Sequence, residues 1–274
     1  MAAMIEAGGQ DSAAQAMRSQ RLEFPGASGE MLAGRLDAPP GTPRAYALFA
    51  HCFTCGKDVF AASRIAQALS AHGIAVLRFD FTGLGASEGD FANTNFSSNV
   101  ADLQAAADFL RRELRAPRIL IGHSLGGAAM LAVAGALPEA QAVVTIAAPC
   151  DPAHVTHLFG EQLDDITARG EAMVQLAGRP FRIKRQFLED VAEHSLRNKI
   201  ATMRKALLVM HAPGDSTVGV NNALDIFTAA KHPKSFISLD TADHLLSKRD
   251  DAIYVANLIA AWSARYLREP VATP

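Results

Sequence analysis

A serine flanked by glycines at residues 122–126 is the strongest candidate for catalytic chemistry in this sequence. The segment reads Gly-His-Ser-Leu-Gly and matches the pattern G-x-S-x-G, with Ser124 at its centre. In that pattern the serine adopts a strained backbone on a sharp turn, and the glycines avoid clashes that a Cβ would cause. An apolar run at residues 118–121 predicts a strand before the turn, and small residues at 127–130 predict a helix after it. We therefore interpret Ser124 as a nucleophile.

A second serine, Ser87, matches the same pattern. It lies in Gly-Ala-Ser-Glu-Gly at residues 85–89 and also follows a predicted strand. The residues after it, 90–95, are turn-forming and do not start a helix of small residues. Because the nucleophile's turn needs a strand before it and a helix after it, we interpret Ser87 as part of a loop.

An acid and a histidine stand where such a nucleophile needs them. A serine hydroxyl becomes a strong nucleophile when a histidine removes its proton, and a carboxylate fixes the tautomer of that histidine. Asp215 follows a predicted strand at residues 206–211, and His244 follows another at residues 235–239. The carboxyl ends of parallel strands share one edge of a sheet, so both side chains are expected beside Ser124. The predicted triad is Ser124, Asp215 and His244.

Other residues compete for these two roles. Asp151 follows the preceding predicted strand and is the alternative acid, whereas Asp215 could instead cap the helix that follows it. His244 could be a loop histidine with a structural role only. Its neighbour Asp243 is expected to point away from the site. The remaining candidates fit less well by position: His72, His123 and His232.

The negative charge that develops on a substrate carbonyl needs two backbone N–H donors, an oxyanion hole. The residue after the nucleophile, Leu125, is the first expected donor. The loop after the predicted strand at residues 45–51 reads His-Cys-Phe-Thr from His51, and Phe53 is the expected second donor. The alternative is that Phe53 only lines the substrate pocket.

These residues depend on an alternation of strands and helices that starts near residue 20. Apolar runs predict strands at residues 21–25, 31–36, 45–51, 74–81, 119–122, 143–148, 206–211 and 235–239. Apolar residues at helical spacing predict helices at residues 59–72, 100–114, 126–137, 221–230 and 252–267. The alternation predicts an α/β fold with a mostly parallel, doubly wound sheet and an N-terminal antiparallel hairpin. We expect residues 1–20 to be a disordered leader and residues 21–274 to be one domain.

Residues 151–200 interrupt the alternation. They are charged and predict helices around a hairpin with a turn at residues 178–180, so we interpret them as a cap inserted into the domain. Four apolar side chains of this cap are candidates for the substrate pocket, with the cap's own core as the alternative: Phe159, Leu163, Phe181 and Phe187. A basic run could attract an acidic substrate or form a solvated face: Arg179, Arg182, Lys184 and Arg185.

Composition excludes several functions. The chain has 274 residues, 49% of them hydrophobic, and a formal net charge of -2. No excess of Lys and Arg is present to bind nucleic acid or an anionic membrane. The apolar stretches are too short to span a bilayer, and the N-terminus lacks the basic and apolar blocks of a signal peptide. We expect a cytoplasmic protein with no nucleic-acid or membrane partner, and the sequence leaves open a homodimer.

The chain contains three cysteines, of which two form a C-x-x-C pattern at Cys52 and Cys55. A zinc site needs about four nitrogen or sulfur ligands, and no second cysteine pair follows. A thioredoxin-like redox pair would open a helix in a smaller domain. We therefore expect Cys52, Cys55 and Cys150 to be packed thiols in a reducing compartment, with a redox or metal role as the alternative.

Five segments together resemble the α/β-hydrolase superfamily, over residues 20–268. They read HCFTCGKD from residue 51, FDFTGLGASEGDF from residue 79, GHSLGG from residue 122, HAPGDSTV from residue 211 and DHLL from residue 243. In detail the chain resembles bacterial hydrolase modules of the kind fused to an OsmC-like domain, and it is similar to small-ester and cinnamoyl-type esterases. It departs from the esterase pattern His-Gly, because Cys52 follows His51. No OsmC-like domain follows before residue 274, so we expect a stand-alone relative or a shortened chain.

The triad and the resemblance imply a serine esterase that acts on a small-molecule ester. We expect Ser124 to form an acyl-enzyme, with His244 carrying the proton and water releasing the acyl group. No metal or organic cofactor is expected. An acyltransferase or a serine peptidase would use the same triad, and a non-catalytic binding protein could share the same fold.

Overall fold

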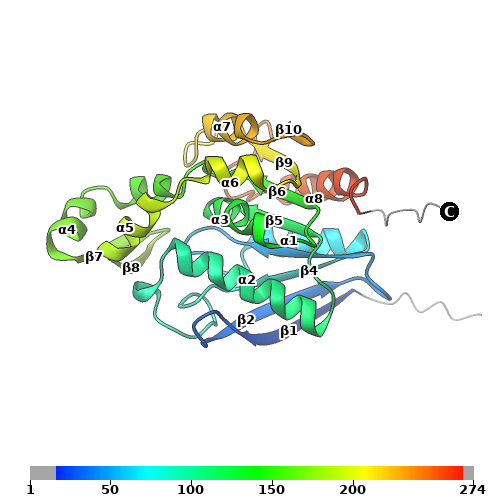
Figure 1. Ribbon diagram of the computed structural model, residues 1–274, viewed down its shortest axis with the longest axis horizontal. Coiled ribbons are helices and arrows are strands. Elements are labelled where there is room, and N and C mark those ends of the chain that lie inside the picture. Colours follow the sequence, from blue (N-terminus) through cyan, green and yellow to red (C-terminus); the bar gives the residue numbers. More distant parts are fainter. Residues whose placement is uncertain (1–16, 268–274) are drawn as a thin grey trace, which may run out of the picture.

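A computed structural model describes residues 17–267 of the chain, and an eight-stranded sheet lies at its centre (Figure 1). Along the sheet the strands are β1 (Arg18–Pro25), β2 (Met31–Ala38), β4 (Ile74–Phe79), β3 (Ala45–Ala50), β5 (Ile119–His123), β6 (Ala142–Ile146), β9 (Ala206–His211) and β10 (Lys234–Ser238). From β4 to β10 neighbouring strands are parallel, and β1 and β2 are antiparallel to their neighbours. The predicted mostly parallel sheet with an N-terminal hairpin is confirmed.

The N-terminal hairpin is longer than its apolar pattern. β1 begins at Arg18, because Arg18 pairs with Ala38 at the open end of the hairpin. The predicted strand begins at residue 21, since the polar residues before it carry no apolar alternation. Residues 1–16 of the predicted leader lie outside the described part of the chain.

Helices cover both faces of the sheet because its central strands are apolar on both sides. Every residue of β3, β4, β5, β6 and β9 is buried. Side chains on one face pack against α1 (Phe60–Ala71) and α8 (Arg249–Ser263). Side chains on the other face pack against α2 (Phe96–Glu113), α3 (Leu125–Val133), α6 (Leu196–Thr202) and α7 (Asn221–Ala229). Burial on two faces explains why these strands are continuous apolar runs.

Several helix boundaries differ from the predicted ones, among them the start of α2 and the end of α3. α2 starts at Phe96, four residues before the predicted residue 100, because Asn95 and Ser98 form a capping box. The Asn95 side chain accepts the Ser98 N–H, and the Ser98 hydroxyl accepts the Asn95 N–H. α3 ends at Val133 and continues as a short 3₁₀ turn, η2 (Ala134–Ala136).

Between β6 and β9 the chain leaves the sheet. It forms η3 (Pro152–Phe159), α4 (Gln162–Arg169), the antiparallel hairpin of β7 (Glu171–Leu176) and β8 (Arg179–Lys184), and α5 (Arg185–Glu193). We call residues 152–193 the cap. Figure 1 shows α4, α5 and the hairpin at one end of the molecule, beyond the sheet. The predicted insertion, residues 151–200, extends into α6, which packs against α3 and α7 beside the sheet.

A buried group of charges ties the segment after β3 to β4. Arg78 of β4 is 1% exposed, and its Nε lies 2.8 Å from a carboxylate oxygen of Asp37. The same guanidinium also donates to the backbone carbonyl of Lys57. The ammonium of Lys57 in turn lies 2.5 Å from Asp80. Buried charges are stable only when paired in this way, so the network fixes the chain just beyond the loop of Phe53.

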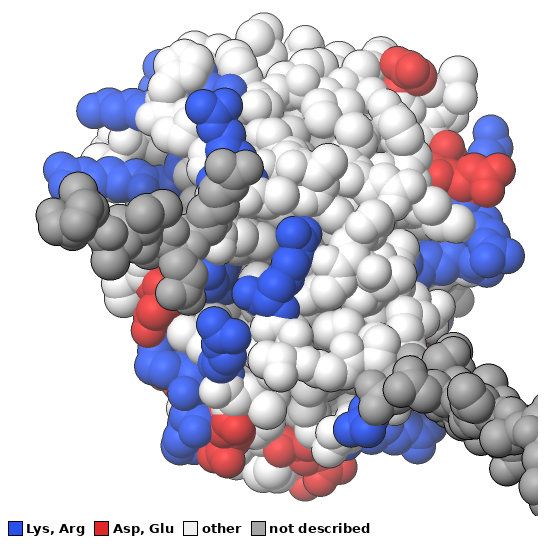
Figure 2. All heavy atoms as spheres, turned by 90° about the vertical axis from the view of Figure 1, so that its right-hand side faces the viewer, with Lys and Arg blue, Asp and Glu red and all other residues white. Residues whose placement is uncertain are grey.

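The surface carries mixed charge. Figure 2 shows the end of the molecule opposite the cap, where Lys and Arg side chains and Asp and Glu side chains surround a broad area that carries neither. This mixture agrees with the net charge of -2. Among residues 17–267, none of the helices has both the length and the apolar character that crossing a bilayer requires.

Candidate active site

Ser124 occupies the turn between β5 and α3. Its φ of 55° is a left-handed conformation that costs a non-glycine residue about 1–3 kcal/mol. A Cβ on Gly122 would stand 2.4 Å from the carbonyl oxygen of Gly126, and a Cβ on Gly126 would stand 2.4 Å from the carbonyl oxygen of His51. Glycine is therefore required at both positions for the turn to close and to lift Ser124 above the sheet.

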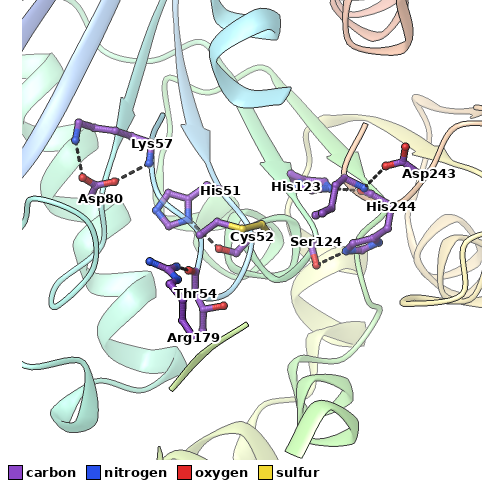
Figure 3. The surroundings of a disulfide bond; sticks show 12 residues. His51, Cys52, Thr54, Lys57, Asp80, His123, Ser124, Arg179, Asp243 and His244 are labelled. Carbon is purple, nitrogen blue, oxygen red and sulfur yellow. Dashed lines mark hydrogen bonds and ion pairs between the residues drawn. A yellow bond between two sulfur atoms is a disulfide. The ribbon is translucent and has the colours of Figure 1, made fainter. Parts of the chain in front are cut away.

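The structure brings Ser124, His244 and Asp215 together. Nε2 of His244 lies 3.1 Å from Oγ of Ser124, and Nδ1 of His244 lies 2.7 Å from Oδ2 of Asp215. Figure 3 shows the His244 ring turned toward the Ser124 hydroxyl. Asp215 follows β9 and His244 follows β10, and the parallel pairing of these strands places their carboxyl ends side by side. Three residues that are far apart in sequence therefore meet at one edge of the sheet.

Asp215 is held as a carboxylate. Its Oδ1 accepts the backbone N–H groups of Thr217 and Val218, each at 2.9 Å, while Oδ2 faces His244. Burial of this side chain opposes ionisation, but the hydrogen bond from His244 and the two N–H donors outweigh it and lower the pKa of Asp215. An ionised Asp215 keeps a proton on Nδ1 of His244, which leaves Nε2 free to accept the Ser124 proton.

His123 supports the loop of His244, a role that the sequence did not indicate. Its Nε2 lies 2.6 Å from the backbone carbonyl of His244, to which it donates. Burial lowers the pKa of His123 to about 4, so the ring is neutral near pH 7. The only available clue was the position of His123 beside the nucleophile, since its partner lies 121 residues later in the chain.

The competing residues have other partners. The Ser87 hydroxyl donates to the backbone carbonyl of Asp80 at 2.5 Å, within its loop. Asp151 accepts the N–H of Ala153 at 3.0 Å and so caps η3. Asp243 points away from the His244 ring and accepts N–H groups that follow it in its own turn, which agrees with the expectation for its orientation.

Two backbone N–H groups near Ser124 are available for a ligand. Leu125 is the first residue of α3, and Phe53 lies in the loop after β3. Within residues 17–267, neither N–H has a hydrogen-bond acceptor in the protein. The start of α3 also carries the partial positive charge of a helix N-terminus. The oxyanion hole of Leu125 and Phe53 stays a prediction that this geometry allows.

A small cavity of about 40 Å³ reaches Ser124. Ser124, Leu125 and Phe53 line it together with residues of η3 in the cap. Its other lining residues are Pro149, His154, Val155, His157, Leu158, Thr217 and Val218. A cavity of about 540 Å³ beside β2 is larger, but no member of the Ser124 group lines it. The cavity that matters for chemistry is therefore the small one.

The four apolar cap residues proposed for the pocket do not line this cavity. Phe159 is 0% and Phe187 is 3% exposed, and both rings pack against Phe53 of the loop after β3. Phe181 packs against Phe91, and Leu163 is half-buried on the same core. These four residues belong to the core of the cap, which was the alternative to a substrate pocket in the sequence analysis. The residues that the sequence missed, His154 and His157, lie on η3 just after the carboxyl end of β6.

The basic run of the cap also has structural partners. The Arg179 guanidinium donates to the backbone carbonyl of Thr54, in the loop of Phe53. Arg182 lies 3.5 Å from Glu171 across the hairpin, and Lys184 donates to Asn93 at 2.6 Å. Arg179 therefore connects the cap to the candidate oxyanion loop.

The expectation of packed thiols at Cys52 and Cys55 is wrong. The two sulfurs are joined in a disulfide, and their Cα atoms lie 5.5 Å apart, within the range that a disulfide spans. The C-x-x-C spacing allows either state, so the spacing alone could not correct the expectation. Cys150 is a free cysteine, and burial together with Asp225 raises the pKa of its thiol.

Comparison with known proteins identifies the family of this chain. The model of the alpha/beta hydrolase family matches residues 47–274. A solved esterase domain of a Rhodothermus marinus protein is 55% identical, covers 92% of this chain and 100% of its own, and superposes with a TM-score of 0.77. The fold is shared with ferulic-acid-bound Est1E from Butyrivibrio proteoclasticus, which is 18% identical, with coverages of 90% and 100% and a TM-score of 0.79.

A curated mouse relative is the mitochondrial palmitoyl-protein thioesterase ABHD10. It is 27% identical over 186 residues, which are 65% of this chain and 62% of the mouse protein. The match thus spans less than two thirds of the length of that relative.

The buried neutral His123 makes folding depend on pH. The unfolded side chain binds a proton near pH 6.5, whereas the folded one binds it only near pH 4. The contribution of neutral His123 to the unfolding free energy is therefore fully present above about pH 6.5, and it is lost as the pH falls toward 4. Between pH 7 and pH 5, we expect wild type to lose about 1–2 kcal/mol more unfolding free energy than His123→Gln, measured by urea unfolding. Parallel pH profiles of the two proteins would contradict this role.

Proposed function

Because the chain belongs to the alpha/beta hydrolase family, we propose that it is a serine hydrolase of carboxylic esters with Ser124, His244 and Asp215 as its catalytic triad. The observation that carries the proposal is the chain of two hydrogen-bonding contacts from Asp215 through His244 to Ser124, which ends on a strained serine. The 55% identity to an esterase domain supports ester hydrolysis as the reaction.

The first half of the proposed reaction makes an acyl-enzyme. Nε2 of His244 takes the Ser124 proton as Oγ attacks the ester carbonyl carbon. The negative charge that forms on the carbonyl oxygen is stabilised by the N–H groups of Leu125 and Phe53, each worth about 10²–10³ in rate. The carboxylate of Asp215 stabilises the imidazolium formed at the same moment. His244 then gives its proton to the departing alcohol as the bond from carbonyl carbon to alcohol oxygen breaks.

The second half repeats these roles with water. A water molecule replaces the alcohol beside Nε2 of His244 and attacks the acyl carbonyl as His244 removes its proton. The same two N–H groups stabilise the second tetrahedral intermediate. Collapse of that intermediate releases the carboxylic acid and returns the proton to Oγ of Ser124.

The proposed substrates carry short acyl groups. The cavity at Ser124 has a volume of about 40 Å³, whereas sites that enclose drug-sized ligands have roughly 300–1,000 Å³. Phe53, Val155 and Leu158 supply apolar lining, and His154 and His157 supply the polar part of the wall. Such a cavity fits an acyl group of a few carbons and excludes a long chain in this conformation.

Thioester hydrolysis is the second candidate. The observation that favours it is the 27% identity to a mouse palmitoyl-protein thioesterase, over 62% of the length of that protein. A triad that forms an acyl-enzyme accepts esters and thioesters alike, because the leaving group departs in the first half of the reaction. The size of the cavity sets the same limit on the acyl group in either case.

Loss of the nucleophile tests the triad. We expect Ser124→Ala to reduce kcat for p-nitrophenyl acetate by about 10³–10⁶, because the variant lacks the hydroxyl that forms the acyl-enzyme. The matched control is Ser87→Ala, which removes the serine of the second G-x-S-x-G match and should retain turnover. A fluorophosphonate probe should label Ser124 alone. Wild-type turnover by Ser124→Ala, or labelling of Ser87, would refute the assignment.

Acyl-chain length tests the cavity. With nitrophenyl esters and thioesters of acetate, butyrate, octanoate and palmitate, we expect kcat/KM to fall at least about tenfold from butyrate to palmitate, since the long chain finds no room. Enlarging the cavity with Leu158→Ala should shift the preference toward octanoate. A wild-type preference for palmitate would show that the cap opens to admit a long chain and would overturn the size argument.

A further inference from the structure

The disulfide lies in the loop that supplies one of the two proposed oxyanion donors. Cys52 and Cys55 bracket Phe53 and Thr54 directly after β3, and Figure 3 shows this loop beside Ser124 and His244. We propose that Cys52 and Cys55 are a redox-active pair whose disulfide form holds the Phe53 N–H in place for catalysis. This inference rests on the proposed function, because it concerns the oxyanion hole of that reaction.

The peptide group between Cys52 and Phe53 links the disulfide to the donor. The carbonyl oxygen of Cys52 faces Nδ1 of His51 at 2.8 Å and the N–H of Cys55 at 3.2 Å. The carbonyl of Cys52 and the N–H of Phe53 belong to one planar trans peptide, so they point in opposite directions. Whatever fixes that carbonyl therefore also aims the Phe53 N–H.

His51 is suited to this task. Its ring is buried, and burial lowers its pKa, so it is neutral and can carry a proton on the nitrogen that faces the Cys52 carbonyl. The ring packs edge-on against the ring of Phe81, with 5.0 Å between the ring centroids, and this contact limits rotation of the His51 ring. His51 and the N–H of Cys55 thus both bind the carbonyl oxygen of Cys52, and the disulfide keeps Cys55 close enough to do so.

The loop is strained, so it depends on these restraints. Thr54 has a φ of 60°, a conformation that costs a β-branched residue about 1–3 kcal/mol. Three contacts oppose its relaxation: the disulfide, the hydrogen bond from Cys55 to Cys52, and the Arg179 guanidinium on the Thr54 carbonyl. Opening the disulfide frees Cys55 to move away, which breaks the hydrogen bond to the Cys52 carbonyl and lets the peptide plane rotate.

The two sulfurs differ in access. Cys52 is only 6% exposed, whereas Cys55 is partly exposed at the surface of the loop. A small thiol can therefore approach Cys55 more readily than Cys52.

The chemical step is thiol–disulfide exchange with a low-molecular-weight thiol such as glutathione. Its thiolate attacks Sγ of Cys55, forms a mixed disulfide and releases Cys52 as a thiolate that takes a proton. A second thiol attacks the sulfur of the small molecule, which releases Cys55 as a thiol. Two small thiols become one disulfide, and the protein gains two electrons and two protons. A low-molecular-weight disulfide reverses the step.

A redox titration of the full chain tests this proposal. The protein is equilibrated in buffers of reduced and oxidised glutathione, the Cys52–Cys55 state is read by alkylation and mass spectrometry, and p-nitrophenyl acetate turnover is measured. As the disulfide opens we expect kcat to fall about 10- to 100-fold while KM changes less than about threefold, because the donor acts mainly in the transition state. Cys52→Ser/Cys55→Ser should have the low kcat under all conditions.

The matched control is Cys150→Ser, which removes the remaining cysteine and should respond to glutathione as wild type does. An unchanged kcat in a protein whose disulfide is open would overturn the inference while leaving the proposed hydrolase intact. The wild-type titration decides the matter even when the double variant fails to fold. Absence of turnover and of fluorophosphonate labelling at Ser124 in both redox states would overturn the proposed function, and this inference with it.

Discussion

The hydrogen bond of 2.7 Å between His244 and Asp215 is the interaction that the site depends on. It requires the ends of β9 and β10 to lie side by side, which their parallel register provides up to His211 and Ser238. It also requires an ionised Asp215, which the N–H groups of Thr217 and Val218 secure. With the imidazole fixed in this way, the strained turn at Ser124 has only to bring one hydroxyl to Nε2.

The opposite wall of the site depends on a different set of contacts. The loop of Phe53 is held at its end by Arg78, which binds the Lys57 carbonyl, and along its length by the disulfide and by Arg179 of the cap. The Phe53 ring also packs with Phe187 of the cap. The cap and the candidate oxyanion loop therefore pack together. A substitution in either segment is expected to alter the position of the Phe53 N–H.

The sequence predicted the sheet and the positions of Ser124, Asp215 and His244 because apolar strands and turn residues leave local patterns. It did not predict the contact of His123, since that contact joins segments that only the sheet brings together. In sequence, the aromatic residues of the cap fit a substrate pocket and a hydrophobic core equally well. The packing in the structure shows that Phe159 belongs to the core. The C-x-x-C spacing likewise fits thiols and a disulfide equally well.

A crystal structure of the protein inactivated by a small phosphonate would show the triad and both N–H donors at once, because the tetrahedral phosphorus imitates the intermediate. We expect phosphorus bonded to Oγ of Ser124, its oxygen about 3 Å from the nitrogens of Leu125 and Phe53, and His244 still bridging to Asp215. An adduct on another residue, or a phosphonate oxygen far from both N–H groups, would contradict this expectation.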